Sequence, residues 1–113
     1  MKKSVLTAAV ALASVSAMLL SGCSTTAAGA SRACIILPDA DSGTRWEPGD
    51  RPALEAALTD AGFEADIQNA QSDTSKYATI GDQMLTKGCG VMILVDYQGA
   101  GAAVAAKAKE QGI

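Results

Sequence analysis

The sequence predicts an α/β fold in which three strand–helix repeats form the start of a parallel sheet. Short apolar runs alternate with segments whose apolar residues recur at helical spacing, and short polar loops join them. Such alternation implies parallel strands connected by right-handed crossovers. The usual arrangement places the first and third strands side by side, with the second strand outside the first.

The first repeat begins with residues 33–37, ACIIL, a short apolar run that Pro38 ends. After a loop, Gly62 ends a helical segment, and Pro48 or Pro52 suits its first turn because the missing N–H costs nothing there. Five residues carry the helical spacing: Ala53, Leu54, Ala57, Leu58 and Ala61.

The second repeat starts with residues 63–67, FEADI, which alternate as a half-buried strand does. The loop that follows offers Ser72 or Asp73 as a helix N-cap, and Gly88 comes directly after the predicted helix. The apolar face of this helix is carried by Tyr77, Ile80, Met84 and Leu85.

The third repeat opens with residues 91–95, VMILV, a continuous apolar run typical of a strand covered on both faces. Residues 99–109 are rich in Ala and predict the third helix. The start of this helix approaches a dinucleotide-binding fingerprint, but Val104 stands where that pattern needs Gly or Ala. We therefore interpret it as a Gly-rich turn into a closely packed helix.

The amino-terminal residues predict export. Lys2 and Lys3 precede residues 5–20, an apolar run too short for a membrane span of ~20 residues. The run ends in LSGC, which resembles the lipobox of bacterial lipoproteins, with Cys23 as the lipid-bearing residue. We expect a lipoprotein signal peptide at 1–22, a flexible tether at 23–32 and a lipid-anchored protein on the extracytoplasmic face of the cell membrane. An ordinary signal peptide with a chance Cys is the alternative.

Composition excludes several function classes. Without Lys2 and Lys3, seven basic side chains stand against twelve acidic ones, which disfavours nucleic acid as a partner. The chain has no His, so His-based catalytic triads and His metal sites are impossible. Export also removes the chain from the NAD and ATP pools, and we expect no cofactor.

Cys34 and Cys89 stand at the amino ends of two strands that should be neighbours. Adjacent strands lie ~4.8 Å apart, which suits disulfide geometry, and the outside of a cell is oxidising. We expect a Cys34–Cys89 disulfide with a structural role; two buried free thiols are the alternative.

The loop after the first strand, DADSGTRWEPGDRP, holds Arg45 and the only Trp of the chain, Trp46. In open parallel sheets, ligands bind at the carboxyl ends of the strands where the strand order reverses. An indole packs against a sugar ring, and a guanidinium donates to its hydroxyls. The alternative is a Trp that packs the loop onto the first helix. Asp39 and Asp41 either orient Arg45, contact the ligand or form turns.

The loop after the third strand begins with Asp96, followed by Gln98. A strand-end carboxylate can accept two hydroxyl protons from one sugar. Asp96 is equally suited to cap the third helix.

These residues resemble the amino-terminal lobe of type I periplasmic sugar-binding proteins, which have a Rossmann-like parallel sheet. The likeness is to the D-xylose-binding and multiple-sugar-binding proteins of ATP-binding cassette importers. It covers about residues 33–113, and the Arg45-Trp46 pair is its most specific part. The stretches IQNAQSD and AKAKEQGI are shared more widely.

The resemblance implies that Arg45 and Trp46 contact a bound monosaccharide, with Asp96 and Gln98 sharing the strand-end position. It implies a monomeric, non-enzymatic protein that captures a xylose-like pentose or a hexose and presents it to membrane permease subunits. A sugar-sensing lipoprotein that signals to a receptor kinase is one alternative. An exported α/β enzyme with its catalytic groups beyond Ile113 is another.

About 80 residues follow the tether, fewer than the ~100–150 of a typical single domain. We therefore expect a fragment of a longer protein. The second lobe and the hinge that the resemblance implies are not in the sequence, and one lobe supplies half of a sugar-binding cleft.

Overall fold

The computed structural model describes residues 31–39 and 44–113, and confirms the α/β class. The predicted signal peptide, Cys23, most of the tether and Asp41 lie outside the described residues. The elements in chain order are β1 (Arg32–Leu37), the π-helical turn η1 (Trp46–Asp50), α1 (Arg51–Asp60), β2 (Glu64–Asn69), α2 (Thr74–Lys87), β3 (Val91–Leu94) and α3 (Ala100–Glu110).

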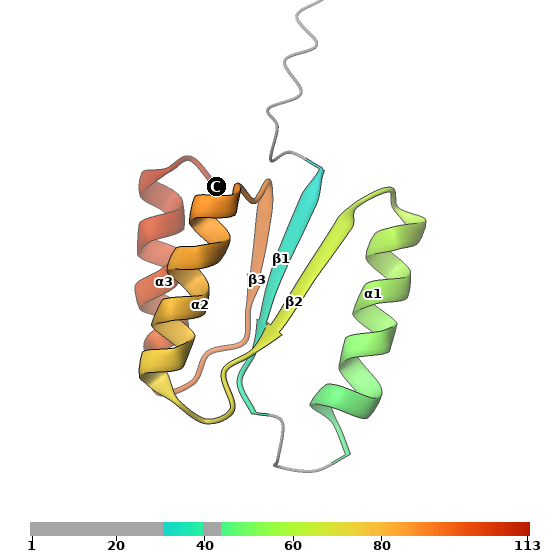
Figure 1. Cartoon of the computed structure of the whole chain (residues 1–113), viewed down its shortest axis with the longest axis horizontal. Coiled ribbons are helices and arrows are strands. Elements are labelled where there is room, and N and C mark those ends of the chain that lie inside the picture. The colour runs from blue at the N-terminus through green and yellow to red at the C-terminus, as the bar shows by residue number, and fades with distance from the viewer. Residues whose placement is uncertain (1–30, 40–43) are drawn as a thin grey trace, which may run out of the picture.

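The three strands form one parallel sheet in the order β2-β1-β3, as the sequence predicts (Figure 1). Residues 33–37 of the central strand β1 are fully buried. The Cα partners of Ile35 are Ile67 on one side and Ile93 on the other. The strands therefore share one amino edge, where β1 begins, and one carboxyl edge.

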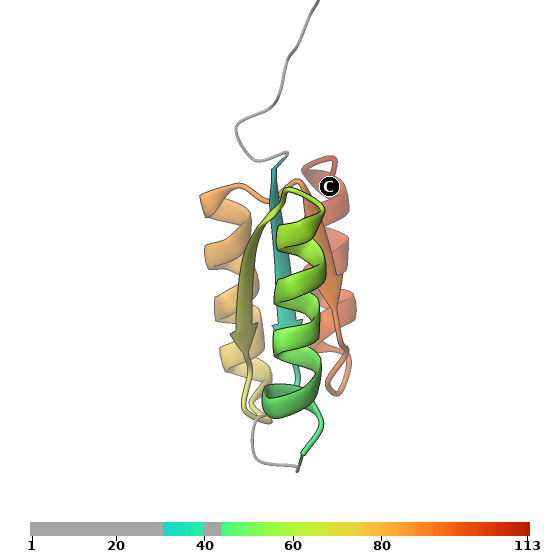
Figure 2. The same cartoon turned by 90° about the vertical axis from the view of Figure 1, so that its right-hand side faces the viewer.

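The helices form two layers around this sheet (Figure 1), and the view in Figure 2 has α1 in front of the sheet with α2 and α3 behind it. α1 lies on one face, while α2 and α3 pack together on the other. The chain moves outward from β1 to β2 across the first face and returns to β3 across the second. The segments that follow β1 and β3 consequently leave the sheet toward opposite faces, which is the arrangement that opens a crevice at the carboxyl edge.

The main core lies between the sheet and the pair α2 and α3. Tyr77, Ile80, Met84 and Leu85 are buried, so the predicted apolar face of α2 is confirmed. At Gly81 a Cβ atom would lie 2.5 Å from a methyl carbon of Val104 on α3. Glycine at this position therefore lets the two helices approach closely.

The predicted helix ends are largely confirmed. Asp73, one of two predicted caps, is the N-cap of α2, and its carboxylate accepts the N–H of Lys76 at 2.9 Å. Gly88 follows α2 with φ 87°, a conformation that glycine adopts without strain. Of the two prolines, Pro52 occupies the first turn of α1, whereas Pro48 lies in η1.

The prediction that β3 is covered on both faces is wrong for the described residues. Val91 and Ile93 each keep 38% of their surface exposed. Both project to the face that carries α1, but α1 packs against β2 and leaves β3 uncovered. An apolar run therefore shows that a strand can be buried on both faces. Whether both faces are in fact covered depends on where the neighbouring helices pack.

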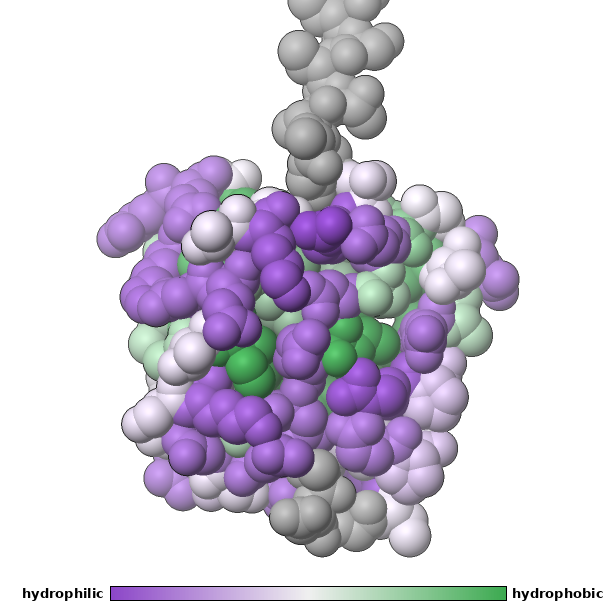
Figure 3. Space-filling view, viewed as in Figure 1, coloured by the Kyte–Doolittle hydropathy of each residue, from purple (hydrophilic) through white to green (hydrophobic). Residues whose placement is uncertain are grey.

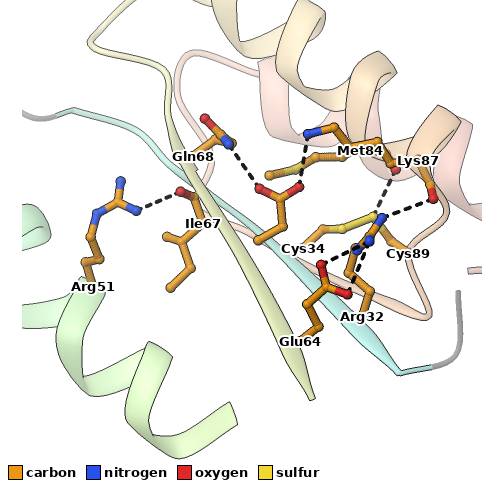
Figure 4. A network of polar contacts seen from close by, with 10 residues as sticks. Arg32, Cys34, Arg51, Glu64, Ile67, Gln68, Met84, Lys87 and Cys89 are labelled. Carbon is orange, nitrogen blue, oxygen red and sulfur yellow. Dashed lines mark hydrogen bonds and ion pairs between the residues drawn. A yellow bond between two sulfur atoms is a disulfide. The ribbon is translucent and has the colours of Figure 1, made fainter. Parts of the chain in front are cut away.

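At the amino edge, Arg32 of β1 binds both β2 and the end of α2 (Figure 4). Its guanidinium pairs with Glu64 of β2 at 3.0 Å and donates to the carbonyl of Lys87, the last residue of α2, at 3.1 Å. A cation at a helix C-terminus is favourable because the last carbonyls carry partial negative charge. Because β1 begins at Arg32, the last residue of the predicted tether is part of the sheet.

The outer edge of β2 is closed by polar groups. Arg51 donates from Nη1 to the Ile67 carbonyl at 2.7 Å (Figure 4). The side of the molecule on which β2 is the nearest strand is mostly hydrophilic, with hydrophobic residues gathered in two patches (Figure 3). Such features disfavour pairing of this edge with another strand.

Cys34 and Cys89 form a disulfide with their Cα atoms 5.9 Å apart, as expected from the strand order. Cys34 is fully buried and Cys89 is 5% exposed. The bond links β1 to the residue pair that precedes β3, and it lies toward the amino edge (Figure 4).

We predict that replacing both cysteines by Ala lowers the free energy of unfolding by about 4 kcal/mol, because the bond spans 55 residues and restricts the unfolded chain. Urea unfolding of the two proteins measures the difference. In the denatured, unreduced wild type, a thiol titration should find neither Cys34 nor Cys89 reactive. Two reactive thiols at these positions would contradict the disulfide.

Candidate functional site

An open, mainly apolar groove lies at the carboxyl edge of the sheet, on the face that carries α1. It has a volume of about 360 Å³. It exists because α1 covers β2 and leaves the same face of β3 bare. The groove is lined by Leu37, Arg45, Trp46, Asp50, Ala53, Leu54, Ile93 and Val95.

Arg45 and Trp46 sit together at this groove. The guanidinium carbon of Arg45 lies 4.3 Å from the indole centroid, and its Nε pairs with Asp50 at 3.0 Å. The Arg45 side chain is 72% exposed, whereas Trp46 is half-buried. A cation over an indole face is attracted by the ring's electrons, so Arg45 holds the ring in place while most of its own side chain stays exposed.

A polar network anchors the turn that carries Trp46. Glu47 receives a hydrogen bond from Arg51 at 3.0 Å and one from Asn69 of β2 at 2.7 Å. The bond from Arg51 lowers the pKa of Glu47, and the same contact raises the pKa of Arg51. η1 is therefore fixed to the carboxyl end of β2.

The network was not predicted from the sequence. The spacing of Glu47 and Arg51, four residues apart, is a signal that could have found their ion pair. Asn69 gives no comparable signal, because its partner is distant in sequence.

The N-cap residue of α3 is Gly99 and not Asp96, which the sequence offered for that role, but the Asp96 carboxylate still binds the first turn of the helix from three residues earlier. The carboxylate accepts the backbone N–H of Gly99 at 3.0 Å, of Gly101 at 2.8 Å and of Ala102 at 3.3 Å. These bonds, the one from Gly99 above all, lower the pKa of Asp96. The carboxylate is thus directed toward α3, while the preceding residue, Val95, lines the groove.

The remaining predicted residues lie around the carboxyl edge. Gln98 is exposed and has φ 51°, and its side chain makes no hydrogen bond with the part of the chain that the structure describes. Asp39 is half-buried two residues beyond β1. The structure therefore brings Arg45 and Trp46 together at the groove, and does not place Asp96, Gln98 or Asp39 in its lining.

Within residues 31–39 and 44–113, no group of three or more potential ligands could hold a metal ion. No helix in these ranges has the length and apolar character needed to cross a membrane. In comparisons with known proteins, no family model, no curated protein and no solved structure matches the chain.

We predict that Asp96→Asn lowers the melting temperature near neutral pH, because the amide cannot accept the three N–H groups as the carboxylate does. The lowered pKa of Asp96 means that its contribution is complete above about pH 4 and is lost as the pH falls through the folded-state pKa. The difference between the two melting temperatures should accordingly shrink in acid. A circular-dichroism melt at several pH values measures it.

Asp60→Asn is the control, since it removes a carboxylate at the end of α1. It should change the melting temperature little at any pH. Equal pH profiles for the wild type and Asp96→Asn would contradict the binding of the first turn of α3 by the Asp96 carboxylate.

Proposed function

We propose that the chain is the sugar-binding lobe of a lipid-anchored extracytoplasmic protein. It captures a monosaccharide, a xylose-like pentose or a hexose, and delivers it to the permease subunits of an ATP-binding cassette importer. The observation that carries this proposal is the Arg45–Trp46 pair at a groove on the carboxyl edge, beside the point where the segments after β1 and β3 diverge.

The chemistry of the groove favours a small neutral ligand with one apolar face. Trp46, Leu37 and Ile93 offer apolar surface to the C–H groups of a sugar ring. The exposed guanidinium of Arg45 and the carboxylate of Asp50 offer donors and acceptors at the rim for hydroxyl groups. Because the two charges are paired, the rim favours a ligand without net charge.

The position of the amino terminus of the fold supports an anchored binding protein. β1 begins at Arg32 on the amino edge, and the groove lies at the opposite edge. A tether that enters at the amino edge leaves the groove directed away from its anchor. The lipobox-like LSGC and Cys23 are the sequence basis for that anchor.

Binding rather than catalysis is the better proposal for this groove. Most of the described residues that line it are aliphatic, and the two charged ones among them, Arg45 and Asp50, are paired with each other. We propose a monomer that needs no cofactor and does not bind nucleic acid.

We predict that Trp46→Ala weakens monosaccharide binding about 30-fold or more, the scale expected for truncating a central aromatic contact. Calorimetry on the full-length exported protein measures the dissociation constants. D-xylose, D-ribose, D-glucose and D-galactose are tested separately. Phe63→Ala is the matched control, because it truncates a half-buried aromatic next to β2 at the amino edge. Absence of binding to all four sugars, or equal affinity in Trp46→Ala, would contradict the proposal.

A further inference from the structure

Tyr77, on α2, binds the backbone of the residue that follows β3. Its hydroxyl donates to the Val95 carbonyl at 2.9 Å, and its side chain is fully buried in the core between α2 and the sheet. Burial, with the charge of Asp96 as a smaller cause, raises the pKa of Tyr77 to about 12, so the hydroxyl stays a donor at any physiological pH. Tyr77 is out of reach of any ligand in the groove, yet it fixes the residue that forms one groove wall.

Asp96 holds the same turn from its other end. A carboxylate has about four acceptor positions, and three are taken by the N–H groups of Gly99, Gly101 and Ala102. Little acceptor capacity remains for a ligand. Asp96 instead connects the end of β3 to the first turn of α3.

Gly101 shows how closely these groups are packed. A Cβ atom at this position would lie 2.9 Å from Oδ1 of Asp96 and 3.1 Å from the hydroxyl oxygen of Tyr77. No methyl group fits there unless one of the two moves. Tyr77, Asp96 and Gly101 therefore form one brace, named here the strand-end brace, that holds residues 95–98.

We propose that Asp96 and Tyr77 are positioning residues of the sugar site, and that Asp96 does not contact the sugar. This inference rests on the proposed function. The strand-end brace places Val95 in the groove wall and holds Gln98 at φ 51°, a strained value for a non-glycine residue that surrounding structure must maintain. A wall that is already in place does not have to be ordered when the ligand binds, so the brace increases affinity without touching the ligand.

Three substitutions disturb the brace in different ways. Tyr77→Phe removes only the hydroxyl, Asp96→Asn removes the charge, and Gly101→Ala adds a methyl group. The proposal predicts that all three weaken binding of the best of the four sugars by a similar factor, about tenfold, although only Asp96 is at the surface. Calorimetry on the full chain, at a temperature where circular dichroism shows each variant folded, measures this.

Leu85→Ala is the control for a loss of stability alone. Leu85 is buried on α2 about two turns beyond Tyr77, away from the brace. It should lower the melting temperature and leave the dissociation constant unchanged. Amide hydrogen exchange in the sugar-free protein provides a second readout: protection at Gly101 and Ala102 should fall in Asp96→Asn and stay unchanged in Leu85→Ala.

Two patterns would overturn the inference. If Asp96→Asn alone loses affinity, Asp96 is a direct ligand of the sugar. If none of the three variants loses affinity while the wild type binds sugar, the brace does not position the site. Absence of sugar binding by the wild type would instead overturn the proposed function, and unchanged exchange at Gly101 and Ala102 in Asp96→Asn would then overturn the brace as well.

Discussion

The parallel pairing of β1 with a strand on each side is the constraint on which the structure depends. β1 is fully buried from Ala33 to Leu37, and the direction of the chain reverses across it, outward to β2 and back to β3. Because right-handed crossovers in opposite directions place their helices on opposite faces, α1 and α2 are separated by the sheet, and α3 packs beside α2. The opening at the carboxyl edge follows from this separation, and the groove in which Trp46 lies forms there because α1 covers β2 and leaves the same face of β3 bare.

Two polar networks hold the two sides of that opening. On the β2 side, Glu47, Arg51 and Asn69 fix the turn that carries Trp46. On the β3 side, Tyr77 and Asp96 fix the end of the strand. Both networks bond backbone or side-chain groups that would otherwise be left unpaired at strand or helix ends, so the same bonds that complete the fold also position the groove.

The sequence predicted those parts of the fold that local patterns determine. The spacing of Tyr77, Ile80 and Met84 identified the buried face of α2, and Gly88 marked its end. The neighbouring positions of β1 and β3 followed from topology, and the Cys34–Cys89 pair followed from them.

Other features depend on contacts between distant residues, and local patterns do not determine these. The exposure of Ile93 depends on where α1 packs, which the apolar run of β3 does not encode. The direction of the Asp96 carboxylate was left open because the residue suits both a ligand site at a strand end and the start of a helix, and the placement of α3 decides between them. For the candidate site, sequence reasoning located the Arg45–Trp46 pair at the carboxyl edge; whether the pair binds a sugar is a proposal.

The central claim is that a sugar binds in the groove beside Trp46, and chemical-shift mapping by NMR tests it most directly. Adding D-xylose, or a hexose if that binds better, to ¹⁵N-labelled protein should shift the amide signals of Trp46, Leu54, Ile93 and Val95, which all line the groove. The amides of Arg32, Glu64 and Gly90 at the amino edge should stay in place. Shifts confined to the amino edge or to the exposed face of α3 would contradict the account.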